Sequence, residues 1–233
     1  SSYEALVALN KVCNHISAWT YDSHFPAFFI TNNTFTGRQE RYQTMSENGV
    51  DYIFDQSHGN TNQAMSILKG FLTSHMARDL SLNVNDMIKE FCDHYFKNAS
   101  DSIQKYLDSY RTWTLYAYNV LGMHTDINGS NFMNSKFWPK GTLLEWVNIF
   151  EKAINDIEAL KWTDKVIYEK VYTRICRESL TPRYLLISLY ASSFSEIEAD
   201  QMKRQFKKDC YSCGVTQVKE AVSIEELFVK WGI

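Results

Sequence analysis

The sequence is poor in the residues that interrupt regular structure, with only three prolines and nine glycines among 233 residues. This scarcity excludes a collagen-like chain and favours helices over a turn-rich β fold. The chain also lacks an uninterrupted apolar run of about 18 residues, so we expect no membrane-spanning helix. Hydrophobic residues make up 45% of the sequence, which excludes a disordered chain and predicts one or two soluble globular domains.

An excess of basic residues is missing as well. The chain has 24 Lys and Arg against 27 Asp and Glu, which gives a formal net charge of −3. Proteins that bind nucleic acid usually carry a basic excess or a basic patch. We therefore expect neither nucleic acid nor a membrane among the partners of this protein.

Cysteine is too scarce for a disulfide scaffold, and its number is odd. A zinc ribbon would need a second pair beside Cys210 and Cys213. A thioredoxin-like pair opens a helix, where the helix N-terminus lowers the thiol pKa, whereas this pair ends a charged helical stretch before Gly214. We expect ordinary thiols or one local disulfide here, with redox chemistry as the alternative.

Residues 1–62 differ from the rest of the chain. Helical spacing of apolar residues in 3–13 is followed by alternation in 15–21, which predicts a strand. A helix over 37–48 and a second short strand over 50–54 follow a long polar and aromatic loop at 22–36. Alternating helices and strands are typical of a parallel sheet.

Residues 63–233 are helical in pattern throughout. Apolar residues recur at helical spacing, first at Ala64, Ile67, Leu68, Phe71 and Leu72 and then in several later stretches. Helix starts are predicted at Asn83 and at the Ser-x-x-Glu pairs that begin with Ser195 and Ser223. The segment 122–141, rich in Asn and Gly, is predicted to be a long surface loop.

Two parallel strands pose a physical problem, because parallel sheets occur almost only with both faces covered. Two strands also cannot close a barrel, which needs about eight. We therefore expect the remaining strands to come from the parent chain or from another protomer, and we favour the parent chain. On this reading the sequence is the C-terminal piece of a larger enzyme.

Four segments of the sequence carry a family resemblance: residues 16–25, 48–56, 68–95 and 174–184. They contain a Trp-x-Tyr strand, a Gly-Val strand ending in an acid or amide, a helix, and an aromatic-rich stretch. This series resembles a bacterial domain family of unknown function that is found C-terminal to α-glucuronidase-like or β-hexosaminidase-like glycoside hydrolase barrels.

The resemblance implies a mainly α chain with a small parallel β part (α/β). Residues 1–62 would be the last strand–helix units of a (β/α)8 barrel, and residues 63–233 an appended helical domain. It also implies a carbohydrate partner, a parent that is a glycoside hydrolase, an inactive fragment, and a secreted, periplasmic or cell-surface location. The sequence departs from many relatives at Asp55-Gln56, where they have Glu or Gln followed by Gly.

In a (β/α) barrel the functional face lies at the C-terminal ends of the strands. Aromatic rings stack on the apolar face of a sugar, and carboxylates and amides bind its hydroxyl groups. This rule predicts the substrate-binding residues Trp19, Tyr21, Asp22, His24, Asp55, Gln56 and His58. Ordinary packing is the alternative role for Trp19 and Tyr21.

Asp22 and Asp55 are also the candidates for catalysis, because they end neighbouring strands and glycoside hydrolysis uses a carboxylate pair. Substrate binding or helix capping is the alternative that we favour for both. No His-x-x-x-His spacing accompanies His24 or His58, so we expect no metal and no cofactor. The leading hypothesis is a sugar-binding C-terminal part of a carbohydrate-active protein, and the alternative is a non-catalytic helical binding domain.

Overall fold

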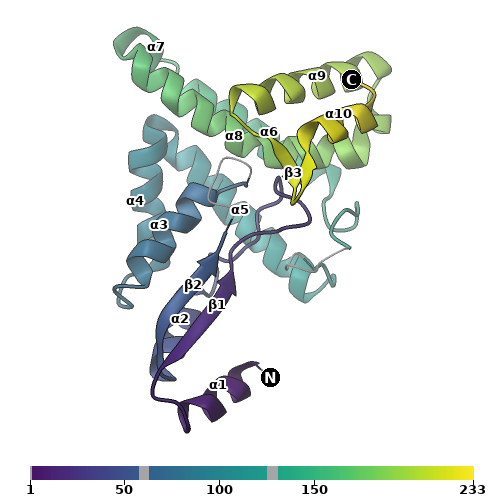
Figure 1. Ribbon diagram of the computed structural model, residues 1–233. Helices are drawn as coiled ribbons and strands as arrows, with labels where there is room; N and C mark the ends of the chain where they lie inside the picture. Colours follow the sequence, from purple (N-terminus) through teal and green to yellow (C-terminus); the bar gives the residue numbers. More distant parts are fainter. Residues whose placement is uncertain (1, 58–62, 125–130) are drawn as a thin grey trace.

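The computed structural model describes residues 2–57, 63–124 and 131–233. This part of the chain is mainly helical and carries a small two-stranded parallel sheet, as the sequence predicts (Figure 1). The helices are α1 (Ser2–Asn10), α2 (Arg38–Glu47), α3 (Ser66–Met76), α4 (Val84–Phe96), η1 (Lys97–Ala99), α5 (Ser100–Asn119), α6 (Lys140–Asp156), α7 (Leu160–Thr163), α8 (Lys165–Tyr190), η2 (Ala191–Ser193), α9 (Glu196–Ser212) and α10 (Ile224–Trp231). The strands are β1 (Ile16–Tyr21), β2 (Val50–Gln56), β3 (Gln217–Lys219) and β4 (Val222–Ser223).

Strands β1 and β2 run parallel, with Trp19 opposite Phe54 and Thr20 opposite Asp55. Side chains alternate across β1, so that Ile16 and Thr20 are buried while the residues between them are more exposed. Helix α2 connects the strands and covers the face that carries Thr20 and Asp55. The sheet with α1 and α2 extends away from the larger helical part of the molecule (Figure 1).

The loop at residues 22–36 has no helix or strand, as predicted, but most of it is buried rather than on the surface. Phe28 donates its backbone N–H to Val218 near the C-terminus and accepts a backbone hydrogen bond from Ala64. The hydroxyl of Tyr110 on α5 donates to the carbonyl oxygen of Thr31 at 2.6 Å. Backbone groups of Phe28 and Thr31 in this buried loop are therefore satisfied by distant segments, which no local sequence pattern indicates.

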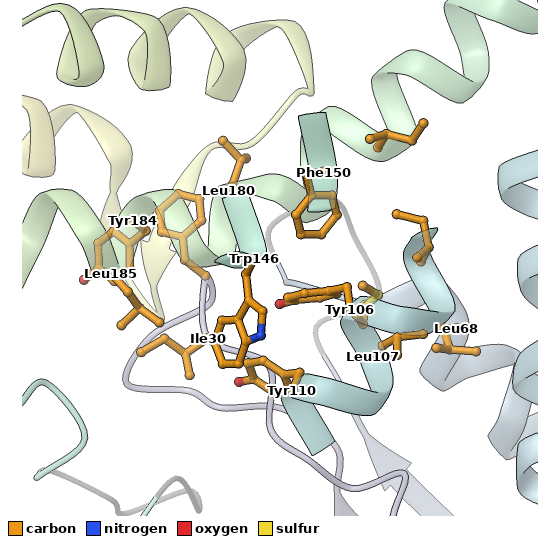
Figure 2. Packing of buried hydrophobic residues seen from close by; sticks show 14 of the residues in the cluster. Ile30, Leu68, Tyr106, Leu107, Tyr110, Trp146, Phe150, Leu180, Tyr184 and Leu185 are labelled. Carbon is orange, nitrogen blue, oxygen red and sulfur yellow. The ribbon is translucent and has the colours of Figure 1, made fainter. Parts of the chain in front are cut away.

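The helical part packs around the aromatic rings of α5 and α6. Trp146 is fully buried, and its ring centroid lies 5.7 Å from that of Tyr106 and 5.3 Å from that of Tyr110 (Figure 2). Its indole N–H donates to Ser109 Oγ at 2.8 Å, which satisfies the polar atom in an otherwise apolar core. Phe150 packs against the other side of Tyr106, with ring centroids 4.6 Å apart. These contacts join α5 to α6, and buried residues of α8 such as Leu180 belong to the same hydrophobic cluster.

Helices α4, α9 and α10 begin where the sequence predicts. Asn83 accepts hydrogen bonds from the backbone N–H groups of Asn85 and Asp86, and Ser195 and Ser223 each form a complete capping box. Gly49, which follows α2, has the left-handed φ of 82° that favours glycine.

Three local features differ from the sequence prediction. Ile67 is 41% exposed, because the buried face of α3 contains Leu68, Lys69 and Leu72. The described part of the 122–141 connector contains no helix before Lys140, as expected, but Trp138 within it is fully buried. The antiparallel pair β3–β4 is too short to leave a periodic signal in the sequence.

The core is continuous across residue 62, the boundary suggested by the sequence. Buried residues from 22–57, such as Phe29, Phe35 and Tyr42, join the same hydrophobic cluster as those of α5, α6 and α8. Phe29 packs against Tyr184 of α8, with ring centroids 5.0 Å apart. Within the described ranges, no helix combines the length and apolar character needed to span a membrane.

Candidate functional site: a buried charge cluster behind an exposed aromatic face

One face of the β1–β2 sheet is aromatic and exposed to solvent. Trp19 is 64% exposed, and Tyr21, Tyr52 and Phe54 are exposed to a lesser degree on the same face; we call these four residues the aromatic face. The rings of Trp19 and Phe54 meet edge to face with centroids 5.1 Å apart. The indole N–H of Trp19 donates to Gln56 Oε1 at 3.0 Å, which fixes the orientation of the ring.

The opposite side of the strand ends is charged and buried. Asp22, immediately after β1, is 1% exposed, and Arg38 at the start of α2 is fully buried. Arg38 Nη2 lies 2.6 Å from each carboxylate oxygen of Asp22, and Thr34 donates its hydroxyl to the same carboxylate. Asp22 is therefore held by one donor from the loop at 22–36 and by one donor from α2.

Asp55 of β2 accepts a hydrogen bond from the other terminal nitrogen of Arg38. Its Oδ2 accepts from Arg38 Nη1 at 3.4 Å and from Thr73 Oγ1 on α3 at 2.8 Å, while Oδ1 accepts from Thr20 at 2.8 Å. Tyr42 OH also lies 3.3 Å from Oδ2. The structure thus brings Asp22 and Asp55 together as the sequence predicts, with an arginine bound to both.

Lys69 of α3 completes this group, which we call the strand-end cluster. Its side chain is buried and its Nζ donates to the backbone carbonyl oxygen of Asp22. The members of the strand-end cluster are Asp22, Thr34, Arg38, Tyr42, Asp55, Lys69 and Thr73.

The charged groups in the cluster, together with their burial, shift the pKa values of Asp22 and Lys69. Burial alone raises the pKa of Asp22, but the positive charges of Lys69 and Arg38 outweigh it and hold the pKa at about 2. Burial lowers the pKa of Lys69 to about 8, against the opposing effect of Asp22. Asp22 is consequently a permanent anion at neutral pH, and Lys69 is the member that loses its charge in mildly alkaline solution.

Of the remaining predicted site residues, Gln56 belongs to the aromatic side and His24 is buried. Gln56 lies at the end of the aromatic face beside Trp19, as described above. His24 is buried, and its ring meets Phe132 edge to face at 4.5 Å between centroids. At 2% exposure, its side chain is not open to solvent. His58 lies outside the described residues.

Sequence reasoning missed Arg38 and Lys69, the two cations of the cluster. Arg38 is one of several charged residues in a polar helix, and nothing in its neighbours distinguishes it. Lys69 did carry a signal, because it lies at helical spacing between Met65, Leu72 and Met76, all of which are buried. A lysine within such a stripe is expected to reach a buried acceptor.

The two sides of the site support different chemistry. Asp22 and Asp55 each accept from Arg38. The lowered pKa of Asp22 makes it unlike the raised-pKa acid that protonates a leaving group. The aromatic face presents rings with an adjacent amide, which suits a ligand with an apolar face and hydroxyl groups. Among residues 2–57, 63–124 and 131–233, no group of three or more His, Cys, Asp or Glu side chains is arranged to hold a metal ion.

Comparison with known proteins relates the first part of the chain to a family model. Residues 1–108 match the family model described as Domain of unknown function (DUF4838), a span that includes the aromatic face and the strand-end cluster and ends within α5. No curated protein and no solved structure matches the chain. The match makes residues 1–108 similar to a family whose function is not assigned.

Proposed function

We propose that this chain is the C-terminal part of a carbohydrate-active protein of the glycoside hydrolase type, and that its aromatic face binds sugar. The observation that carries the proposal is the exposure of Trp19, Tyr21 and Phe54 at the C-terminal half of a parallel sheet. Large apolar side chains gathered on one open face usually mark a binding surface.

The proposed architecture is a (β/α) barrel of which β1 and β2 are the last two strands. Parallel sheets are otherwise covered on both faces, and here α2 covers only the face that bears Thr20 and Asp55. In a barrel the other face would point inward, with its C-terminal end at the functional side. Trp19, Tyr21 and Gln56 occupy that end of the strands.

The chemistry of the aromatic face suits a pyranose ring. A sugar presents C–H groups on one face, which pack on an aromatic ring, and hydroxyl groups around its edge. Gln56 accepts from the indole of Trp19 through Oε1, so its amide N–H₂ group is the part left to meet a hydroxyl group. The bond to Gln56 also holds the indole ring in one orientation before any sugar arrives.

The strand-end cluster supports this face rather than catalysing a reaction in the proposed function. Arg38 and Lys69 together offset the charges of Asp22 and Asp55, and Arg38 links the ends of β1 and β2 with α3 behind the sheet. Glycoside hydrolysis needs one carboxyl group that can give up a proton and another that attacks or activates water. We place that pair on strands of the parent protein outside this chain, which would leave the chain alone without hydrolytic activity.

The test is whether the chain itself binds sugar. Binding of a panel of monosaccharides and short oligosaccharides is measured by isothermal titration calorimetry or by tryptophan fluorescence. We expect Trp19→Ala to weaken saturable binding by about tenfold or more, since it removes the most exposed ring of the face. Trp162→Ala is the matched control, because Trp162 on α7 is 86% exposed and lies outside the aromatic face. Binding that is unchanged by Trp19→Ala, or absent across the panel, would overturn the proposal.

The second candidate is a non-catalytic domain that binds another protein through this sheet. It is favoured by the strand pairing, because among the described residues β1 and β2 pair as strands only with each other. Open strand edges are templates for pairing with another chain. The oligomeric state, measured by light scattering, distinguishes this candidate. A dimer that the substitution Phe54→Lys dissociates would favour it, provided that the protein has no affinity for sugars.

A further inference from the structure

A pocket lies between α5 and the first turns of α6. Its volume is about 680 Å³, which falls within the range of about 300–1,000 Å³ that is usual for small-molecule sites. Residues of α5 between Asp108 and Tyr116 form one wall, and Thr142 and Glu145 of α6 form the other. None of the lining residues is a member of the aromatic face or of the strand-end cluster, so this pocket is a separate feature of the molecule.

Two aromatic rings form part of this pocket. The ring centroids of Trp113 and Tyr116 are 5.6 Å apart, and their planes are inclined by 47°. Trp113 is half-buried, and its indole N–H donates to the backbone carbonyl oxygen of Phe137 at 2.5 Å, which fixes the ring. Since this donor is already used, the indole meets a ligand with its ring rather than with its N–H group. Tyr116 is 47% exposed, so its ring is open to a ligand as well.

The polar part of the pocket combines carboxylates with hydroxyl groups. Asp108 and Glu145 are the charged residues of the lining, and both are exposed. Thr112 and Thr142 add hydroxyl groups beside the rings. No lysine, arginine or histidine is among the described residues that line the pocket. Its charge is therefore complementary to a cation, and its aromatic rings are complementary to an apolar surface.

Two cations of α5 lie near these carboxylates without forming hydrogen bonds to them. Arg111 Nη1 is 3.8 Å from Asp108 Oδ1, beyond hydrogen-bond distance, and the same nitrogen donates to Asn85 Oδ1 at 2.9 Å. Lys105 lines a neighbouring hollow to which Glu145 also contributes. Within residues 2–57, 63–124 and 131–233, no ion pair joins Lys105 to Asp108 or Glu145. Both carboxylates can therefore accept hydrogen bonds from a ligand.

From this arrangement we infer that the pocket binds a sugar that carries a protonated amine, such as a glucosamine unit. The rings of Trp113 and Tyr116 pack against the C–H groups of the pyranose and attract its positive charge. Asp108 and Glu145 accept hydrogen bonds from the ammonium group, and the threonine hydroxyl groups meet those of the sugar.

Other ligands use only part of this pocket. A quaternary ammonium ion is attracted by the rings but has no N–H group to donate to the two carboxylates. A neutral sugar packs on the rings but leaves both carboxylates without a counter-charge. The site is also independent of the aromatic face around Trp19, so either proposal can fail without the other.

The experiment compares short glucosamine oligomers with N-acetylglucosamine oligomers of the same length by isothermal titration calorimetry, in mildly acidic buffer of low ionic strength. The two ligands share the sugar ring, and acetylation removes the positive charge. We expect the glucosamine oligomer to bind about tenfold more tightly, because two carboxylates accept from its amine. This preference should decrease as salt is added, since salt screens exposed charges.

Substitutions then locate the binding in this pocket. The double variant Asp108→Asn, Glu145→Gln should bind both oligomers with similar affinity, because it keeps the shape of the pocket and removes its charge. Tyr116→Ala should weaken binding of both oligomers. The matched control is Glu151→Gln, which changes an exposed carboxylate of α6 outside the pocket and should alter neither affinity. Trp19→Ala, which tests the aromatic face, should leave the preference for glucosamine unchanged.

Four results would overturn the inference. The first is that neither oligomer binds, and the second is that both bind equally well to the wild type. The third is a preference for glucosamine that persists in the double variant, which would place the site elsewhere. The fourth is tighter binding of choline or of a lysine-rich peptide, which would replace the sugar by another cation.

Discussion

Arg38 Nη2 lies 2.6 Å from both carboxylate oxygens of Asp22, and both side chains are almost completely excluded from solvent. This buried pair joins the end of β1 to the start of α2. Asp55 reaches the other terminal nitrogen of the same guanidinium from β2. One arginine therefore links the two strands and their connecting helix, and its removal tests whether the sheet depends on it.

Replacing Arg38 with Met should destabilise the protein by about 3–5 kcal/mol, because Asp22 and Asp55 would remain buried without their shared cation. Arg38→Lys should recover only part of this loss, since an ammonium group cannot bridge two carboxylates as the planar guanidinium does. Urea unfolding followed by circular dichroism measures both. Arg204→Met removes an exposed ion pair with Asp200 and should leave the urea midpoint nearly unchanged. Equal effects at Arg38 and Arg204 would contradict this account.

Lys69 should make stability rise with pH in mildly alkaline solution. Its pKa is about 8 in the folded protein and 10.5 in an unperturbed lysine, so between these values the unfolded state binds more protons. The free energy of unfolding then increases with pH, by at most about 1.4 kcal/mol per pH unit for one proton. Below pH 8 the cost of burying the charge is fully present, and above pH 10.5 it is relieved.

The measurement is the difference in unfolding free energy between the wild type and Lys69→Met from pH 7 to pH 10. This subtraction cancels the contribution of the buried cysteines and tyrosines, whose pKa values burial raises in the folded protein and which are common to both proteins. The difference should grow in favour of the wild type as the pH rises above 8. Lys105→Met, at an exposed position on α5, serves as the control and should show no such trend. A flat difference for Lys69→Met would show that the buried amine keeps its proton.

Trp146→Ala should cost about 3–5 kcal/mol, because it removes a fully buried indole from contact with Tyr106 and Tyr110 (Figure 2). Trp146→Phe should cost less, since it retains a ring but leaves Ser109 without the indole donor. Trp162→Ala, at an 86% exposed position, should stay within about 0.5 kcal/mol of the wild type. Thermal and urea unfolding of the three variants give the comparison, and a Trp146→Ala protein as stable as Trp162→Ala would refute the proposed core.

The local elements of this fold could be predicted well from the sequence. Side-chain alternation defined β1, and the capping groups at Asn83, Ser195 and Ser223 placed three helix starts correctly. Each of these signals lies within a few neighbouring residues, where the hydrogen bonds that define a strand or a helix end are themselves made. The sequence also predicted that β1 and β2 run parallel, because a helix lies between them.

The site was predicted only in part. The approach of Asp22 to Asp55 follows from parallel strands ending at one edge, and this much the sequence indicated. The presence of Arg38 between them depends on how α2 packs against the sheet, and Lys69 arrives from a third element.

The sequence by itself determined a mainly helical chain with few turns, a small parallel sheet and an aromatic strand pair. Its scarcity of proline and glycine leaves long segments free to form helices, which accounts for that outcome. The tertiary structure alone decided which aromatic rings remain exposed, that the loop at 22–36 is buried, and which charged side chains meet in the strand-end cluster. These depend on contacts between residues far apart in the chain, and such contacts are set by packing and burial rather than by any local pattern.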